Sequence, residues 1–215
     1  ILPRGEVSLD MLDLRSYDDY TYAHSVNVAV LCCVIGMGMQ MNERDLNYLV
    51  TAALLHDLGK LSIPPEILNK PGRLTPEEYQ IMKKHAEYSY KLLSNRWDIS
   101  AHIKQTVLLH HENYDGSGYP DNISGDAIPL GARIIRVCDV YTALISDRSY
   151  RKAFSEQVAV ELMIDETRHF DLKVFLAFQR VIHSEEYEKV RLLTGSRIDA
   201  DSECFMKENY HIVSV

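Results

Sequence analysis

The sequence predicts an all-α fold, and three observations lead to that prediction. Apolar residues recur at spacings of three and four along most of the chain, which is the period of a helix with one buried face. Residues that favour helix starts precede several of these segments, namely Asn42, Thr75, Ser155 and Asp171. No convincing pattern of alternating residues and tight turns indicates a strand hairpin. We therefore expect one compact helical bundle.

The first two predicted helices lead to the most informative motif. An apolar pattern predicts a helix over residues 18–41, with His24 close to its start. Asn42 caps the next helix, which ends at His56 and Asp57. Spacings of three and four place Asp57 on the buried face of this helix. An unpaired buried carboxylate is costly, so it must be neutralised by a raised pKa or paired with a positive group. The adjacent imidazole makes a bound metal the leading candidate.

Proline and glycine divide the middle of the chain. Residues 63–72 contain Ile-Pro-Pro and Lys-Pro-Gly, which exclude a continuous helix. Residues 75–78, Thr-Pro-Glu-Glu, predict a capping box at the start of a single helix that runs to about Leu93. His85 lies at the edge of the inner face of this helix.

Two neighbouring histidines precede a long loop. A helix from about residue 100 carries its apolar face to His110 and His111 at its C-terminus. Residues 112–129 then hold three of the ten glycines and two of the seven prolines, which predicts a structured loop made of turns. Loops of this length inside compact domains are often functional.

The rest of the chain continues the helical pattern. We expect further helices over residues 130–146, which include Asp139, over residues 155–166 and over residues 171–182. The expected division is a leading helix or the end of a linker over residues 1–17, a main domain over residues 18–183, and a C-terminal helical extension over residues 184–215.

Composition excludes several classes of protein. A net charge of −8 leaves no basic footprint for a nucleic-acid polymer. The four cysteines show no Cys-x-x-Cys spacing, so a disulfide framework is not expected and a reducing cytoplasm fits best. The longest apolar stretch, residues 26–39, is interrupted and too short to insert into a membrane. The chain begins with Ile1 rather than Met, so we expect it to be part of a longer protein.

Five of the nine histidines and two aspartates lie at or beside apolar faces, mostly near helix ends. They are His24, His56, Asp57, His85, His110, His111 and Asp139. Imidazole nitrogen and carboxylate oxygen are ligands for divalent transition metals. Seven ligands suit two ions bridged by an aspartate, and two such ions about 3.5–4 Å apart support hydrolysis of a phosphodiester or phosphate ester. Taken singly, an inward histidine is more often a core or capping residue, so the hypothesis depends on the joint pattern.

Several motifs in this order resemble one known family. The stretch from His56-Asp57 to residue 75 closely resembles the HD-GYP subgroup of the HD superfamily of metal-dependent phosphohydrolases. Residues 110–120 do so as well, and they contain the Gly-Tyr-Pro that names the subgroup. Residues 20–25 and 139–151 also match in order and spacing. The resemblance covers roughly residues 20–182 and implies that the main domain is an HD-GYP catalytic domain.

The resemblance implies a cyclic di-GMP phosphodiesterase whose seven ligands hold two divalent ions, with Asp57 as the bridge. A metal-bridging hydroxide would attack one phosphorus, and the 3′ oxygen would leave to give linear pGpG, with a second cut to GMP left open. Lys60 would neutralise the developing charge, so Asp57 and Lys60 are the catalytic candidates. Nitrogen and oxygen ligands favour iron or manganese, with zinc, nickel or magnesium as other occupants.

The resemblance also assigns substrate-binding residues. Arg148 and Arg151 match phosphate-contacting positions of the family, although a solvated basic turn is an equally ordinary use of such residues. For Tyr119 and Gly118, a structural turn and a contact with substrate are both open. Lys60 would lie close to the phosphate.

Four positions depart from the pattern of the family, namely Tyr20, Thr142, Ala86 and Ser89. Members with a third metal carry an acidic ligand four residues before the first histidine, where this chain has Tyr20, so we expect two ions. Asp19 would change this only if the helix register shifted. Thr142, Ala86 and Ser89 replace the usual Asp, Pro and Gly, and none of these changes removes a predicted ligand.

Two alternatives stay open at this level. The substrate could be another cyclic dinucleotide, such as 3′,3′-cyclic GMP-AMP, because the ligand set says little about the base. The domain could also be a catalytically silent sensor or docking module, although silent relatives are expected to lose ligands. A homodimer and an upstream sensory domain are further options.

Overall fold

The computed structural model describes residues 11–12, 14–15, 18–146, 152–185 and 187 of the 215 residues. Every regular element among them is helical, which confirms the predicted fold class. The elements are α2 Asp19–Gly38, α3 Glu43–Leu55, η1 Leu58–Ser62, α4 Pro65–Leu68, α5 Pro76–Lys83, α6 His85–Ser94, α7 Ala101–Leu108, η2 Gly125–Ala127, α8 Leu130–Leu144, α9 Glu156–Asp165, η3 Thr167–His169 and α10 Leu172–Ile182.

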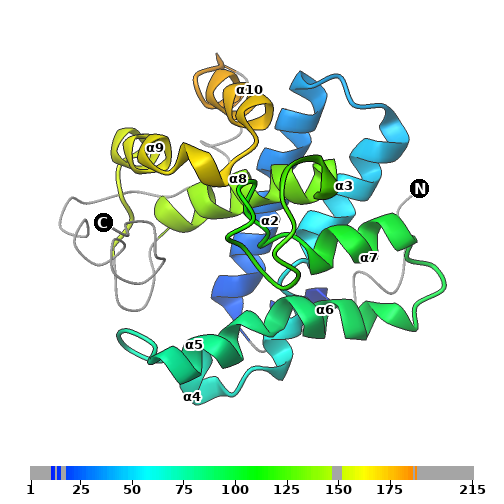
Figure 1. The fold of residues 1–215 in the computed structure, drawn as a ribbon, viewed down its shortest axis with the longest axis vertical. Helices are drawn as coiled ribbons and strands as arrows, with labels where there is room; N and C mark the ends of the chain where they lie inside the picture. Colours follow the sequence, from blue (N-terminus) through cyan, green and yellow to red (C-terminus); the bar gives the residue numbers. More distant parts are fainter. Residues whose placement is uncertain (1–10, 13, 16–17, 147–151, 186, 188–215) are drawn as a thin grey trace.

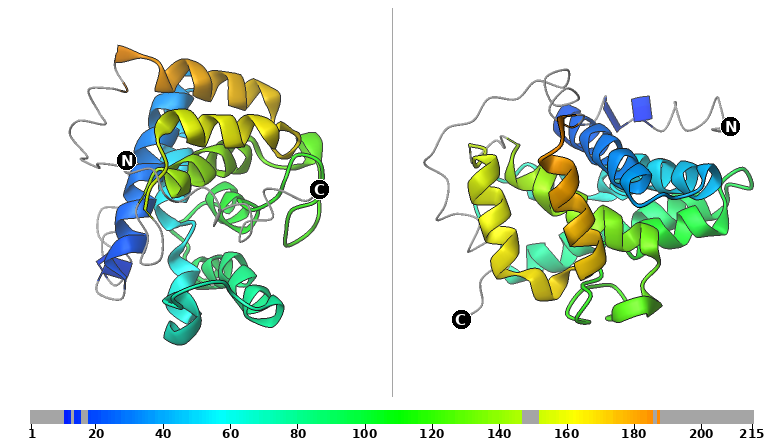
Figure 2. Two further views of the ribbon diagram at one scale, coloured as in Figure 1. Left: turned by 90° about the vertical axis from the view of Figure 1, so that its left-hand side faces the viewer. Right: turned by 90° about the horizontal axis from the view of Figure 1, so that it is seen from above.

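Helix α8 runs through the centre of the bundle (Figure 1). It packs against α2, α3 and α7 on one side and against α9 and α10 on the other. Figure 2 shows α9 and α10 as an outer pair beside α8. Tyr141 of α8 is fully buried and meets the ring of Phe178 in α10 edge-on, with 4.9 Å between ring centroids. Helices α2, α3, α6, α7 and α8 surround the interior that holds the predicted ligands.

Among the described residues, only α2 is long and apolar enough to cross a membrane by length and composition. Helix α2 is longer than the apolar stretch over residues 26–39, because its polar first turns also belong to the helix. It ends at Gly38, whereas the predicted helix extends to residue 41. Half of its most apolar window is buried inside the molecule, against α3, α8 and α10. It also carries His24 into the interior, so α2 serves as a core helix.

The predicted single helix over residues 75–93 is wrong, because two helices, α5 and α6, meet at Lys84. The predicted capping box does form at the start of α5. At the other end of α5, the Nδ1–H of His85 donates to the carbonyl oxygen of Met82 at 2.8 Å. The side chain therefore satisfies a carbonyl that would otherwise lack a partner at the helix end. Periodicity does not detect such a short break.

Two other helices end earlier than predicted. Helix α3 ends at Leu55, so Asp57 lies in the turn that follows it. Helix α7 ends at Leu108, so His110 and His111 also follow the helix instead of lying on it. Asp57 and His110 in these turns are buried and His111 is partly buried, so the apolar pattern continues past the helix ends.

Part of the predicted division lies outside the described residues. Within residues 1–17, Met11 and Leu14 are described and are buried in the main core. Within residues 184–215, Tyr187 is described and belongs to the same core. The leading helix and the C-terminal extension otherwise stay predictions.

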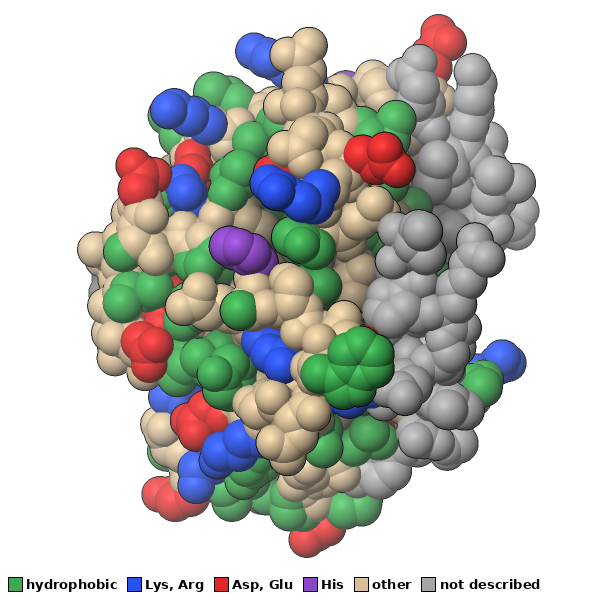
Figure 3. All heavy atoms as spheres, turned by 90° about the vertical axis from the view of Figure 1, so that its right-hand side faces the viewer, with side chains coloured by type: hydrophobic (Ala, Val, Ile, Leu, Met, Phe, Trp, Pro, Cys, Tyr) green, Lys and Arg blue, Asp and Glu red, His purple; other side chains and the backbone are tan. Residues whose placement is uncertain are grey.

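The surface is charged without a basic strip on the face drawn in Figure 3. On that face, Lys and Arg side chains of the described residues lie among Asp and Glu side chains. The net charge of −8 is thus not offset by a basic strip on this face, and the absence of a nucleic-acid partner stays a prediction.

Candidate metal centre

Three helices end at one point in the interior, and a histidine follows each end. His56 caps α3, His85 follows α5 and starts α6, and His110 follows α7. In each, the ring Nδ1–H donates to a backbone carbonyl three residues earlier. The acceptors are those of Ala53, Met82 and Val107, at 2.7, 2.8 and 2.6 Å. Since a carbonyl only accepts, Nδ1 carries the proton, and a neutral ring presents its Nε2 lone pair to the interior. The negative ends of the helix dipoles favour a cation at this point.

His85, His110 and His111 form a group that we call the imidazole cluster. The Nε2 atom of His85 lies 3.3 Å from Nε2 of His110 and 3.0 Å from Nε2 of His111. His85 and His110 both present lone pairs, so two neutral rings repel each other unless a proton or a metal cation lies near. Burial lowers the pKa of His85 to about 4 and holds the pKa values of the other two well below their usual range. A metal cation therefore fits this cluster better than a proton.

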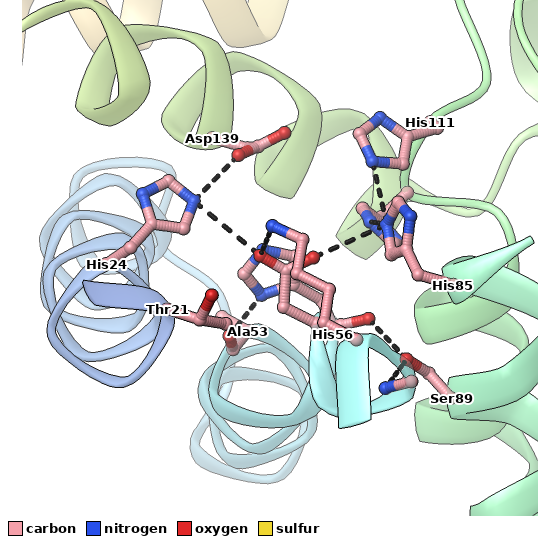
Figure 4. A network of polar contacts seen from close by, with 12 residues as sticks. Thr21, His24, Ala53, His56, His85, Ser89, His111 and Asp139 are labelled. Atoms are coloured by element: carbon pink, nitrogen blue, oxygen red, sulfur yellow. Dashed lines mark hydrogen bonds and ion pairs between the residues drawn. The ribbon is translucent and has the colours of Figure 1, made fainter. Parts of the chain in front are cut away.

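His24, His56, Asp57 and Asp139 form a second group, which we call the aspartate cluster. Figure 4 shows the side chain of His24 pointing toward that of Asp139. The Nε2 atom of His24 lies 2.9 Å from Oδ1 of Asp139 and 4.0 Å from Oδ2 of Asp57. His56 Nε2 lies 3.3 Å from the same Asp57 oxygen, yet it is buried and has no hydrogen-bond partner. Ligand atoms of His24, His56 and Asp57 all lie within 4.8 Å of one another. The orphaned nitrogen and the two carboxylates again suit a cation.

Asp57 faces both clusters with different oxygens. Its Oδ2 lies near His56, while its Oδ1 lies 3.3 Å from Nε2 of His85 in the imidazole cluster. The Nζ of Lys60 donates to Oδ2 at 2.7 Å. Burial alone would raise the pKa of the Asp57 carboxyl, but the charges of His56 and Lys60 hold it well below its usual range. Asp57 is thus a charged carboxylate with only 2% of its surface exposed, placed to be shared by two cations.

The carboxyl group of Asp139 is charged as well. Burial would raise its pKa, but the hydrogen bond and the charge of His24 hold that pKa well below its usual range. In His56, burial lowers the pKa, but the charge and hydrogen bond of Asp57, the charge of Asp139 and the hydrogen bond to the Ala53 carbonyl together raise it, so that the net shift is upward. Carboxylates therefore dominate the electrostatics of the aspartate cluster, whereas the imidazole cluster has no carboxylate of its own.

Ser89 of α6 links the turn that carries Asp57 to the rest of the site. Its hydroxyl donates to the carbonyl oxygen of His56 at 2.8 Å and accepts from the N–H of Gly59 at 2.7 Å. A Cβ added to Gly59 would lie 2.1 Å from the carbonyl oxygen of His85, so only glycine fits there. The serine that departs from the family pattern therefore holds the two segments together.

The loop over residues 112–129 packs on the imidazole cluster. The ring of Tyr119 stacks on that of His111, with 4.7 Å between centroids and 22° between planes. A Cβ added to Gly118 would lie 2.2 Å from the amide nitrogen of Asn113, so this glycine allows a close backbone approach. Gly118 thus has a structural role, and contact of Gly118 or Tyr119 with substrate stays a prediction.

Tyr20 occupies the position at which family members with a third metal carry an acidic ligand. Tyr20 stacks on His24, with 6.1 Å between ring centroids and 10° between planes. The side chain of Asp19 is 87% exposed and lies 3.6 Å from Arg15, so the register does not bring it inward.

Four further basic residues concern the site, two of them predicted and two not. Arg148 and Arg151 lie outside the described residues, and their role stays a prediction. Sequence reasoning missed two half-buried cations beside Tyr119, namely Lys83 and Arg136. The spacing of three between Arg136 and Asp139 on α8 would have placed that arginine near the site.

Comparison with known proteins agrees with this geometry. The family model described as HD domain matches residues 7–174. A cyclic di-GMP phosphodiesterase of Pseudomonas aeruginosa is 36% identical over 182 residues, which are 85% of this chain and 44% of the relative. A 3′3′-cGAMP-specific phosphodiesterase of Vibrio cholerae is 39% identical over 156 residues, 72% of this chain and 30% of the relative. This chain therefore spans less than half the length of these two relatives.

Solved structures show the same fold. An HDG"Y"P protein of Bdellovibrio bacteriovorus matches with a TM-score of 0.63 at 19% identity, over 75% of this chain and 52% of that one. The HD domain of PgpH from Listeria monocytogenes, in complex with cyclic-di-AMP, matches with a TM-score of 0.60 at 15% identity, over 84% of this chain and 95% of that one. The family match, the motifs and the two clusters agree: the chain belongs to the HD-domain family and, within it, to the HD-GYP subgroup.

Proposed function

We propose that this chain is a metal-dependent phosphodiesterase that hydrolyses cyclic di-GMP to linear pGpG. The observation that carries the proposal is Asp57, whose two oxygens each lie 3.3 Å from a histidine of a different cluster. A shared carboxylate between two histidine groups is the arrangement that a pair of divalent cations requires. The relatives named as cyclic di-GMP phosphodiesterases support the choice of substrate.

The two clusters would hold one divalent cation each. Histidine nitrogen and carboxylate oxygen favour iron or manganese, and zinc, nickel or magnesium are other occupants. Bound divalent cations supply positive charge that polarises a phosphoryl oxygen and activates water for in-line displacement. The exposed Asp19 and the stacked Tyr20 support two ions over three.

Residues of the chain orient the reacting groups. Lys60 keeps Asp57 in place through the 2.7 Å contact, and its side chain retains 18% exposure, so its charge can also reach a phosphoryl oxygen. The Nδ1–carbonyl hydrogen bonds fix three histidine rings before substrate arrives. In the overall reaction, water adds to phosphorus and the bond to the 3′ oxygen breaks, which leaves pGpG with a 5′ phosphate. A second hydrolysis would give two GMP.

A second candidate substrate is 3′,3′-cyclic GMP-AMP. A relative with that specificity is 39% identical to this chain, a value close to that of the cyclic di-GMP relative. The two clusters would bind phosphate, which both substrates share, so the residues around the bases must decide. The predicted homodimer, upstream sensory domain and cytoplasmic location stay predictions.

Metal analysis and hydrolysis of the same preparation test the proposal. The protein is purified without oxygen, its iron, manganese and zinc are quantified, and turnover of cyclic di-GMP, 3′,3′-cyclic GMP-AMP and cyclic di-AMP is followed by chromatography. We expect about two ions per chain and the highest kcat/KM for cyclic di-GMP. Faster turnover of 3′,3′-cyclic GMP-AMP would favour the second candidate. Binding without turnover in the metal-loaded protein would identify a silent sensor instead.

A further inference from the structure

Two positively charged side chains gather beside Tyr119 at the edge of the imidazole cluster. Lys83, the last residue of α5, places its Nζ 5.3 Å from the ring centroid of Tyr79 and 5.6 Å from that of Tyr119. Arg136 on α8 donates from Nε to Oδ1 of Asn113, and a Cβ added to Gly118, the neighbour of Tyr119, would lie 2.2 Å from the amide nitrogen of Asn113. Arg136 therefore lies against the loop segment that carries Tyr119. The cations come from two different elements and meet at one place.

Neither cation has a carboxylate partner among the described residues. Among the residues that the structure describes, Lys83 contacts the two aromatic rings, and Arg136 donates to the amide oxygen of Asn113. This is unusual in a chain with 31 acidic and 23 basic residues. The carboxylates of the aspartate cluster already pair with histidines and with Lys60, and Glu166, which lines a pocket with Arg136, lies 3.4 Å from Arg168 and from His169. Two like charges without a counter-charge favour binding of an anion at this place.

The guanidinium group of Arg136 is oriented by a hydrogen bond before an anion binds. Its Nε donates to Oδ1 of Asn113 at 2.9 Å, and Asn113 is itself buried, with 8% exposure. This contact fixes the plane of the guanidinium group, whose two Nη atoms have no partner among the described residues. Those atoms form the edge that binds two oxygens of one phosphate. Asn113 belongs to the loop of Tyr119, so the loop orients the arginine.

We infer that Lys83 and Arg136 bind the phosphate of the cyclic dinucleotide that is not being cleaved. The inference rests on the proposed function, because a cyclic dinucleotide carries two phosphates and only one can lie at the two clusters. Lys60, which is held by its contact with Asp57, would bind the phosphate at the two clusters. Lys83 and Arg136 lie on the side of the imidazole cluster, next to His111 and Tyr119. The substrate class that needs this second subsite is a diester with two phosphates.

The test compares substrates with two phosphates and with one. The double variant Lys83→Met/Arg136→Gln removes both charges, and its metal-loaded form is assayed with cyclic di-GMP and with bis(4-nitrophenyl) phosphate. We expect KM for cyclic di-GMP to rise about tenfold or more, the effect of losing charge-assisted hydrogen bonds, while kcat changes far less. The change in KM for bis(4-nitrophenyl) phosphate, which has a single phosphate, is expected to be much smaller.

Matched variants separate charge from folding. Lys91→Met is the control, because Lys91 also lies over a tyrosine ring, that of Tyr88 at 5.6 Å, but it pairs with Glu87 and is 67% exposed. Lys83→Arg/Arg136→Lys retains both charges and is expected to recover most of the affinity. An equal loss on both substrates, or a KM no different from that of the control, would overturn the inference.

A binding measurement keeps the inference distinct from the proposed function. Cyclic di-GMP is titrated calorimetrically into metal-free protein, which cannot hydrolyse it by the proposed route. We expect weaker binding to the double variant and a shallower dependence of affinity on salt concentration. If the wild-type protein binds cyclic di-GMP without hydrolysing it even with metal, the proposed function fails while this inference stands. If the double variant binds as the wild type does, this inference fails alone.

Discussion

The two clusters lie side by side in one interior but are built differently. The aspartate cluster has two charged carboxylates, and one of them, Asp57, also pairs with Lys60. The imidazole cluster has three histidines that burial keeps neutral, and among the described residues the carboxylate within 4 Å of its nitrogens is that of the shared Asp57. A cation in the aspartate cluster meets fixed negative charge, whereas a cation in the imidazole cluster depends on lone pairs and on Asp57. Asp57 should therefore matter to both clusters, and every other ligand to one.

The largest effect is expected from Asp57→Ala. Loss of the shared carboxylate leaves both cations without it, so metal content and hydrolysis of cyclic di-GMP should both fall to background. The measurements are elemental analysis and a chromatographic assay on the same preparation. Asp98→Ala is a matched control, because Asp98 pairs with Arg96 outside the site. Full activity of the Asp57 variant would refute the bridging role.

Single-cluster variants should separate the two ions. Asp139→Asn in the aspartate cluster and His110→Ala in the imidazole cluster are each expected to lower the metal content from about two ions to about one. Activity should fall at least a hundredfold in both, because in-line displacement needs both cations. If either variant lost both ions, the clusters would not be independent. If neither variant lost an ion, these side chains would not be ligands.

Acid should destabilise the metal-free protein through the imidazole cluster. Burial lowers the pKa of folded His85 to about 4 from an ordinary value of 6.5, so the unfolded chain binds a proton that the folded one does not. Stability is therefore lost as pH falls from about 6.5 to 4, by about 2 kcal/mol at pH 5 for this one group. His56, whose pKa is raised, acts in the opposite direction and offsets part of the loss.

Urea unfolding of metal-free protein at pH 8 and pH 5 measures this effect. His85→Gln should flatten the pH dependence, and His102→Gln, which changes a histidine outside both clusters, should not. A wild-type stability that is equal at the two pH values would contradict the neutral imidazole cluster. The aspartates should add to the loss only below about pH 4, because their folded pKa values lie well below that.

The sequence predicted most of the architecture because its signals are local. Apolar periodicity and capping residues located the helices, and the caps at Asn42, Thr75 and Ser155 form as predicted. The seven proposed ligands were identified from position and motif, and the structure brings all seven together. Their division into two clusters was not visible, because it depends on how the ends of three helices meet in space.

Side chains that act across elements could not be predicted either. The break at Lys84 depends on a hydrogen bond from a histidine ring to a backbone carbonyl, which leaves no periodic signal. Arg136 and Lys83 lie on different helices, and only the packing of α5 and α8 around one loop places them near Tyr119. Ser89 appeared in the sequence only as a departure from the family, without a role.

The smallest expected effect concerns Ser89, the link between the clusters. Its hydroxyl contacts the backbone of His56 and Gly59, while the helix that carries it begins with His85. Ser89→Ala would leave two buried backbone groups unpaired, at a cost of about 1–3 kcal/mol. We expect a lower Tm and a several-fold weaker metal affinity, with all seven ligands still present. Ser94→Ala is the control on the same helix, because Ser94 is exposed and its hydroxyl donates to the carbonyl oxygen of Tyr90 within that helix. A Ser89 variant that lost stability but bound both ions unchanged would show that the clusters hold their spacing without this link.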